Sequence, residues 1–235
     1  MAFRAVRDIW VSLLHLLYPP HCVGCNELGA WLCQQCVSQT PRVEPPFCVR
    51  CGGRVDAANS ELCPRCRTGQ PEIPRIRAVF YFEGAIREAI HRFKYDGVIA
   101  LAQPLGYLMA DYWLTHPTQS DMIVPVPLHP QRRRKRGFNQ AALLSKELSE
   151  RVGLATDTVT LVRHRATASQ VGLDVEQRRS NVRDAFHCTA GRLANKRVLL
   201  IDDVCTTGST LEACARALWK AGVASVEALT LARAH

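Results

Sequence analysis

The sequence predicts an α/β protein in which helices cover both faces of a parallel sheet, preceded by a small cysteine-rich module. From residue 76 onward, short and almost wholly apolar strand candidates alternate with amphipathic helix candidates, as expected for a parallel sheet buried on both faces. Before that point, eight of the 11 cysteines fall between Cys22 and Cys66, among few apolar residues. A chain of 235 residues with 47% hydrophobic content is long enough for one sizeable core and one accessory module.

The expected elements follow one another along the second part of the chain. Strands are expected at residues 76–82, 122–126, 158–162, 198–201 and 226–231. Helices are expected at residues 85–93, 101–114, 140–152 and 211–221, where apolar residues recur at helical spacing. Residues 69–77 are interpreted as a linker rich in turn-forming residues, and residues 78–235 as the sheet-containing domain.

The first 20 residues are expected to form a short amphipathic helix that ends at Pro19 and Pro20. A signal peptide is not indicated, because no small-residue cleavage site precedes those prolines. A membrane span is not indicated either, since Arg4, Arg7 and Asp8 interrupt the apolar stretch. We therefore expect this helix to dock on the rest of the protein, and we place the protein in the cytoplasm.

The charge of the chain favours an anionic partner. Lys and Arg total 30 against 21 Asp and Glu, which gives a formal net charge of +9. Such a surplus suits phosphates, nucleic acid or an acidic protein; the alternative is ordinary solubility.

The cysteines between residues 21 and 68 form four C-x-x-C pairs. Two such pairs can turn four thiolates inward on one tetrahedral ion, so the eight cysteines predict one or two structural zinc ions. The ligand candidates are Cys22, Cys25, Cys33, Cys36, Cys48, Cys51, Cys63 and Cys66. Clustered pairs beside a long cysteine-poor domain fit a reducing compartment better than a disulfide framework. A redox relay and an iron–sulfur cluster are the alternatives, and the sequence leaves open which pairs share an ion.

The most informative segment runs from Val198 to Thr210. An apolar strand delivers Asp202 and Asp203 to its carboxyl end, where open α/β sheets bind ligands. A loop of small hydroxylated residues then enters a helix, and such a helix N-terminus can hold a phosphate. The phosphate-binding candidates are Thr206, Thr207, Gly208, Ser209 and Thr210. The two carboxylates would accept hydrogen bonds from ribose hydroxyls; the alternative is an ordinary strand–loop–helix junction.

This segment resembles the 13-residue signature of type I phosphoribosyltransferases. The whole chain resembles the ComF family of bacterial competence proteins, which join a zinc ribbon to such a domain. Beside the cysteine pairs, the resemblance is carried by residues 93–97 (FKYDG), 124–130 (VPVPLHP), 136–140 (RGFNQ) and 170–173 (QVGL), together with Arg132, Arg134, Arg178, Asn181, Val182, Ala185 and Phe186. It implies the type I phosphoribosyltransferase fold, binding of 5-phosphoribosyl 1-diphosphate with Mg²⁺, and a link to DNA uptake.

The resemblance also assigns roles to residues. It implies that Asp202 and Asp203 hold the ribose hydroxyls and that residues 206–210 hold the 5′-phosphate. The loop that includes Pro127 lies where amidophosphoribosyltransferases carry their diphosphate loop, and residues 165–177 would be a flexible cover. Those amidotransferases need an N-terminal catalytic cysteine, whereas position 2 here is alanine, so use of glutamine is not expected.

Five consecutive cations occupy residues 132–136, directly after that loop. Arg132 and Arg136 are candidates for contact with the diphosphate, but the run could instead track a DNA backbone or be a solvated charged surface. Lys94 and Tyr95 of the first motif either line the same site or are surface residues of a helix.

Two functions from different classes fit these observations. The first is a phosphoribosyltransferase, in which a nucleophile displaces diphosphate from the ribose anomeric carbon. The second is a non-catalytic adaptor that senses phosphoribosyl diphosphate and binds single-stranded DNA or a helicase-like partner through the zinc ribbon and basic run. No acceptor-binding residues can be recognised, so the sequence does not decide between them.

Overall fold

The computed structural model describes residues 19–55, 61–69, 71–165 and 184–234. Except for its last two residues, the expected N-terminal helix over residues 1–20 lies outside this part of the chain. The expected cover over residues 165–177 also lies outside it, except for Arg165.

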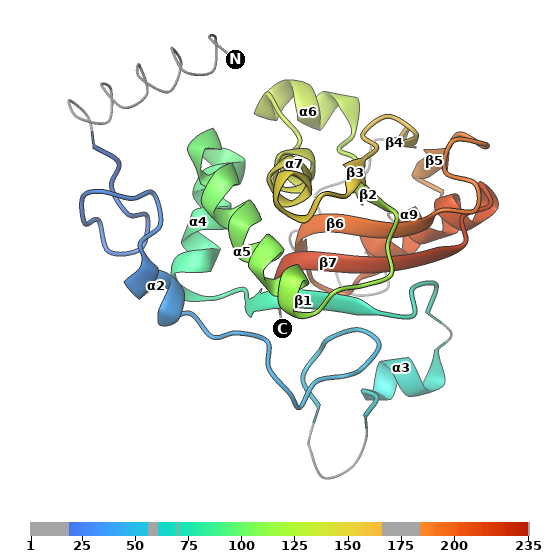
Figure 1. The fold of residues 1–235 in the computed structure, drawn as a ribbon, viewed down its shortest axis with the longest axis horizontal. Coiled ribbons are helices and arrows are strands. Elements are labelled where there is room, and N and C mark those ends of the chain that lie inside the picture. The colour runs from blue at the N-terminus through green and yellow to red at the C-terminus, as the bar shows by residue number, and fades with distance from the viewer. Residues whose placement is uncertain (1–18, 56–60, 70, 166–183, 235) are drawn as a thin grey trace.

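A parallel five-stranded sheet forms the centre of the molecule (Figure 1). Its strands are, in spatial order, β1 (Ile76–Tyr81), β7 (Ser225–Arg233), β6 (Arg197–Cys205), β2 (Met122–Pro125) and β3 (Ala155–Thr156). Successive residues of a strand point to opposite faces. Leu199 and Ile201 of β6 accordingly belong to one apolar cluster, and Val198 and Leu200 to another.

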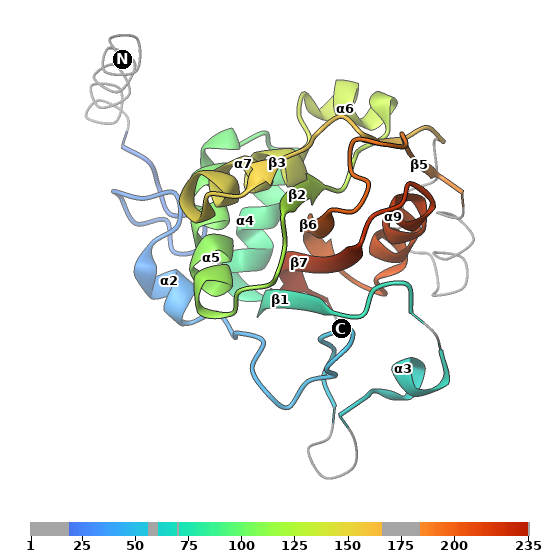
Figure 2. The ribbon, with the colours of Figure 1, turned by 45° about the vertical axis from the view of Figure 1, so that its right-hand side comes forward.

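Helices cover both faces of this sheet, as predicted. α4 (Gly84–Tyr95), α5 (Ala102–Thr115) and α7 (Gln140–Val152) lie on one side, and α9 (Ser209–Lys220) lies on the other (Figures 1 and 2). A 3-10 turn, η1 (Ile99–Leu101), leads into α5. The predicted fold class is therefore confirmed.

The strand expected at residues 158–162 is replaced by two shorter ones. β3 ends at Thr156, and β4 (Leu161–Arg163) pairs antiparallel with β5 (Phe186–Cys188) outside the main sheet. The buried Asp157 causes the break, because its carboxylate accepts hydrogen bonds from the backbone N–H groups of Val159 and Thr160. Those bonds form a turn and end the extended run.

Two further elements differ from the expectation. β6 continues to Cys205 and therefore includes both aspartates, whereas the sequence predicted a strand ending at Ile201. The basic run, for which no helix was predicted, forms α6 (Pro130–Arg136). Proline fits the first helical position because it has no N–H to satisfy there, and Gly137 ends the helix with φ +87°.

The cysteine-rich module lies along β1 and α4 rather than apart from the sheet (Figure 1). Its helices are short, α2 (Gln34–Ser38) and α3 (Pro64–Thr68). Backbone hydrogen bonds join it to β1, among them Val43 N–H to Val79 O at 3.1 Å and Tyr81 N–H to Pro41 O at 2.9 Å. Because β1 begins at Ile76, the last two residues of the expected linker belong to the strand.

In the described part of the chain, every helix is too short or too polar to cross a lipid bilayer.

Candidate functional site

Two adjacent carboxylates lie at the carboxyl end of β6. Asp202 is 9% exposed and Asp203 is 2% exposed, because the strand that carries them is central in the sheet. Lys94, at the end of α4, places its Nζ 2.8 Å from Asp203 Oδ2. The backbone N–H of Asp203 donates to Asp202 Oδ1 at 2.8 Å. The FKYDG motif and the aspartates thus meet in one site.

The two carboxylates do not share this environment equally. Burial, and then the negative charge of Asp203, raise the pKa of Asp202 to about 8, although the charge of Lys94 acts in the opposite direction. The raised pKa favours the protonated form of Asp202 in the free protein. A ligand that brings a positive charge or hydrogen-bond donors to this point would favour the ionised form.

Residues 206–210, hereafter called the phosphate loop after their predicted role, comprise the turn that follows β6 and the first two residues of α9. Gly208 has φ +79°, a left-handed conformation that glycine adopts without strain. The hydroxyls of Thr207 and Ser209 lie 2.8 Å apart and bond to each other. Only Thr206 and Thr210 of the five residues line the large cavity described next. Anion binding by the middle of the loop would therefore use backbone N–H groups at the start of α9, which lack acceptors within the helix.

A cavity of about 1120 Å³ opens between α4, α6 and the carboxyl end of β6. Most of the predicted site residues line it: Lys94, Tyr95, Pro127, Arg132, Arg136, Asp202, Asp203, Thr206 and Thr210. Its basic side chains outnumber its acidic ones, so the cavity suits a ligand with several negative charges.

The helical conformation of α6 divides the basic run into two groups. Arg132 and Arg136, which are four residues apart, line the cavity. Arg133, Arg134 and Lys135 are exposed. Arg136 also lies over the ring of Tyr95, with 5.6 Å between the guanidinium carbon and the ring centroid. A diphosphate contact and a DNA contact can thus come from different residues of one run.

Several cavity residues were not predicted from the sequence. Arg87 and His91 precede Lys94 and Tyr95 by about one or two turns of α4, so helical spacing could have indicated them. Arg163 of β4 is almost fully buried and lies over the ring of Phe186. Burial lowers its pKa. No sequence pattern marks Arg163 as part of a site.

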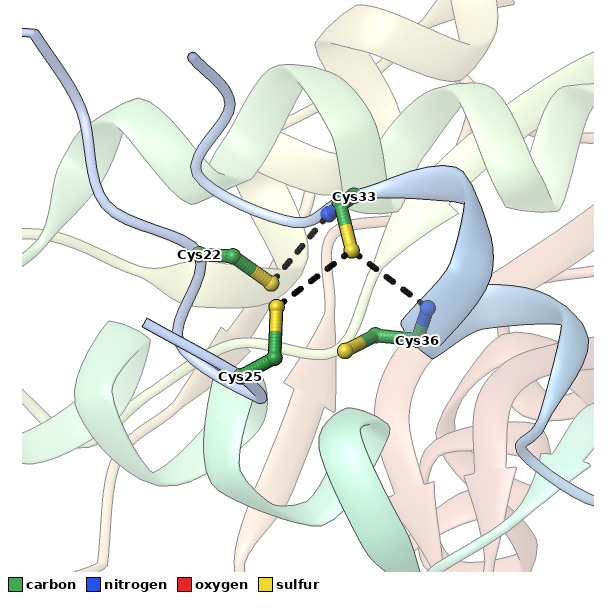
Figure 3. Close-up of side chains that lie close together, drawn as sticks. All are labelled: Cys22, Cys25, Cys33 and Cys36. Carbon is green, nitrogen blue, oxygen red and sulfur yellow. Dashed lines mark hydrogen bonds between the residues drawn. The ribbon is translucent and has the colours of Figure 1, made fainter. Parts of the chain in front are cut away.

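The eight predicted zinc ligands gather in two groups. The first cysteine set is Cys22, Cys25, Cys33 and Cys36, whose sulfur atoms lie within 4.8 Å of one another and point toward a common centre (Figure 3). The second cysteine set is Cys48, Cys51, Cys63 and Cys66, arranged in the same way. Cys25 and Cys33 Sγ are 3.7 Å apart, as are Cys51 and Cys63 Sγ. Zn–S bonds of about 2.3 Å in a tetrahedron would separate neighbouring sulfurs by about 3.8 Å, so both sets fit zinc.

Backbone donors favour the thiolate form that zinc requires. Burial alone would raise the pKa of Cys22, but N–H groups including those of Cys33 and Gly24 point at its sulfur and lower the pKa to about 6. Cys48 has its pKa lowered to about 6 in the same way, with Cys51 as the first donor. These donors favour a thiolate in each set, the form that binds zinc.

A second cavity, of about 780 Å³, lies at the opposite, amino-terminal ends of β1, β6 and β7. Its arginines are engaged within the protein: Arg75 pairs with Glu227 at 2.9 Å, and Arg77 lies over the ring of Phe47. Since open α/β sheets bind ligands at the carboxyl ends of their strands, the larger cavity is the candidate site.

Comparison with known families agrees with this architecture. Residues 13–67 match the double zinc ribbon domain family, and residues 108–235 match the phosphoribosyl transferase domain family. The fold and the site thus define a phosphoribosyltransferase-type protein with a double zinc ribbon. Over 222 residues the chain is 32% identical to competence protein F of Haemophilus influenzae. The alignment covers 91% of this chain and 96% of the relative. The chain belongs to the competence protein F family.

Two other relatives cover nearly the same length. DNA utilization protein YhgH of Escherichia coli is 32% identical over 229 residues, with 93% of this chain and 99% of the relative covered. Competence protein ComFC of Streptococcus pneumoniae is 27% identical over 205 residues, with 86% and 87% covered.

Proposed function

We propose that the protein binds 5-phosphoribosyl 1-diphosphate with Mg²⁺ at the carboxyl end of β6, in the cytoplasm, and serves the uptake or use of DNA. One observation carries the first part: the buried Asp202–Asp203 pair and the phosphate loop open into the same basic cavity. The second part is supported by the names of the relatives, which are competence and DNA utilization proteins.

The chemistry of the site suits each part of this ligand. Asp202 and Asp203 would accept hydrogen bonds from the ribose hydroxyls, while Lys94 keeps Asp203 paired before the ligand binds. The phosphate loop would hold the 5′-phosphate through backbone N–H groups and the hydroxyls of Thr206 and Thr210. The oxygen donors at this end of the sheet are compatible with Mg²⁺, which would neutralise part of the diphosphate charge.

As a transferase, the protein would replace the diphosphate by a nucleophile at the ribose anomeric carbon. The new bond forms as the carbon–oxygen bond to diphosphate breaks, and the departing diphosphate takes both electrons of that bond. Arg132 and Arg136, which line the cavity, would stabilise its charge.

A second candidate function is a phosphoribosyl-diphosphate sensor that contacts single-stranded DNA or a helicase-like protein. The exposed positions of Arg133, Arg134 and Lys135 beside the cavity favour it. Release of diphosphate in the presence of nucleobases or DNA ends would support the transferase, whereas binding without release would support the sensor.

The binding proposal is tested by calorimetric titration with 5-phosphoribosyl 1-diphosphate and Mg²⁺. We expect one saturable site per chain, with ribose 5-phosphate binding less tightly because it lacks the diphosphate. Asp203→Asn should weaken binding by about ten- to a hundredfold, since hydrogen bonds to charged groups contribute about 1.5–3 kcal/mol.

Asp121→Asn is the matched control, because Asp121 pairs with Arg197 on the surface, away from the cavity. It should leave the affinity unchanged. If a folded Asp202→Asn/Asp203→Asn protein bound the ligand as tightly as the wild type, the proposal would be wrong.

A further inference from the structure

The second cysteine set touches the back of the phosphate loop through one side chain. Arg65 lies in α3, between the ligand candidates Cys63 and Cys66. One arm of its guanidinium donates to the backbone carbonyl of Thr207, in the middle of the loop. The other arm lies 3.3 Å from the Glu212 carboxylate, in the first turn of α9. The planar guanidinium thus holds the loop and the start of the helix together.

The contact with Thr207 fixes the direction of the next donor in the loop. In a planar trans peptide the C=O and the following N–H point in opposite directions. Because the carbonyl of Thr207 points to Arg65, the N–H of Gly208 points away from the zinc module. A peptide next to glycine can rotate at little steric cost, so this orientation needs a partner to hold it.

The contact with Glu212 reduces the negative charge at the start of α9. A carboxylate in the first turn of a helix occupies the positive end of the helix dipole, where a phosphate would also bind. Pairing with Arg65 offsets the charge of Glu212. Without Arg65, the peptide between Thr207 and Gly208 would therefore rotate more easily. The negative charge of Glu212 would also repel an anion bound at the same place.

A second arginine ties the same cysteine set to the strand that precedes the loop. Arg233 of β7, which is 8% exposed, donates through Nη1 to Cys51 O at 2.6 Å and to Cys205 Sγ at 3.1 Å. Cys205 is the last residue of β6. The position of the ligand candidate Cys51 is thus linked to the entry of the phosphate loop.

The first cysteine set offers a built-in comparison. Its last pair, Cys33 and Cys36, also begins a short helix, but the position that corresponds to Arg65 is Gln35. Gln35 is exposed. Of the two cysteine sets, the one that faces the phosphate loop therefore has an arginine at this position of its last C-x-x-C pair.

We propose that Arg65 is a positioning residue of the phosphate loop, and that zinc in the second cysteine set thereby raises the affinity for 5-phosphoribosyl 1-diphosphate. This inference rests on the proposed function. Because coupling between two binding sites is reciprocal, the bound ligand must also strengthen zinc binding in the second set.

The first test compares Arg65→Met with Arg67→Met, which removes an exposed arginine from the same helix. Calorimetric titration with the ligand and Mg²⁺ should show an affinity about tenfold or more lower for Arg65→Met, as expected for one lost charged hydrogen bond. Arg67→Met should match the wild type. Arg65→Lys should be intermediate, because lysine keeps the charge but not the two-armed contact. Elemental analysis should find equal zinc in all these proteins.

An Arg65→Met protein with full zinc content and wild-type affinity would overturn the positioning role and leave the proposed function intact. A wild-type protein that did not bind the ligand would overturn both.

The second test needs no substitution in the loop. A zinc-selective chromogenic chelator is added to the wild-type protein with and without the ligand and Mg²⁺. At equilibrium with the chelator, the ligand should raise the apparent affinity of one of the two sites for zinc by about tenfold, the factor by which zinc there raises the affinity for the ligand. It should have no effect on the Asp202→Asn/Asp203→Asn protein. Equal zinc affinities of the wild type with and without bound ligand would overturn the coupling, even if Arg65→Met lost its metal.

Discussion

Asp202 is a carboxyl group that the fold holds in an unfavourable place for a negative charge. It sits on the central strand beside Asp203, and its pKa is raised to about 8 by burial and by that neighbour. Lys94 pairs with Asp203 rather than with Asp202. Carboxyl groups whose pKa is perturbed by burial and by a like charge are common at functional sites.

This environment predicts how stability depends on pH. The folded pKa of Asp202 lies above its unfolded value of about 3.9, so its contribution is fully present below about pH 4 and is lost as the pH rises toward 8. Asp202→Asn should therefore be more stable than the wild type at pH 8, by more than about 1 kcal/mol, since one pKa unit corresponds to about 1.4 kcal/mol. Near pH 4 the advantage should vanish. Urea unfolding followed by circular dichroism measures both.

Asp111→Asn controls for the substitution itself, because that side chain is 59% exposed. An advantage for Asp202→Asn that was the same at both pH values would show that charge on Asp202 is not its cause.

At the scale of elements, α6 shows how secondary structure assigns separate roles within one run of charge. A loop could turn all five cations toward one ligand, whereas a helix presents residues four apart on the same side. Arg132 and Arg136 therefore line the cavity, and Arg133, Arg134 and Lys135 face solvent. The two groups can be tested independently.

Replacing Arg133, Arg134 and Lys135 by glutamine should weaken binding of single-stranded DNA and leave binding of phosphoribosyl diphosphate unchanged. If all three contact phosphates, the slope of log affinity against log salt should become shallower by about 2, at about 0.7 per contact. Fluorescence anisotropy of a labelled oligonucleotide across a salt series measures this.

Replacing Arg132 and Arg136 by glutamine should instead weaken phosphoribosyl diphosphate binding. If DNA binding by the wild type did not depend on salt, Arg133, Arg134 and Lys135 would be solvated surface residues without a role in DNA binding.

At the scale of the whole molecule, the first cysteine set and the sheet domain share one apolar core. Val23, Leu32 and Val37 pack in the same cluster as Phe80 and Ile86. The apolar interior around the first cysteine set is therefore continuous with that of the sheet domain. The apolar residues of the cysteine-rich module are few, and they are buried against the larger domain.

This shared core predicts that Cys22→Ser affects the whole chain. The protein should lose one zinc ion and unfold in a single transition at lower temperature. Loss of packing by Val23, Leu32 and Val37 would cost about 5 kcal/mol, or a fall in Tm of about 10 °C or more. Differential scanning calorimetry and elemental analysis measure the two effects.

Cys188→Ser, at a buried cysteine outside both sets, should keep both zinc ions. Two separate transitions in Cys22→Ser, with the second at the wild-type temperature, would show instead that the domain folds independently of the module.

Features that depend on residues close together in the chain could be predicted from the sequence. The C-x-x-C spacing predicted tetrahedral thiolate sites, because each pair is a local turn. The run from Val198 to Thr210 predicted a strand, two carboxylates and an anion-binding helix start, since all three are read from consecutive residues. Alternating apolar strands and helices predicted the covered parallel sheet.

Features that depend on contacts between distant segments became visible only in the folded chain. The tertiary structure grouped the cysteines into two sets, brought Lys94 to Asp203, and turned the hydroxyl of Thr207 toward Ser209 rather than into the cavity. It also placed Arg65 against the phosphate loop. Packing and long-range hydrogen bonds select these arrangements from several that the local sequence permits equally well, so no pattern of neighbouring residues could have shown them.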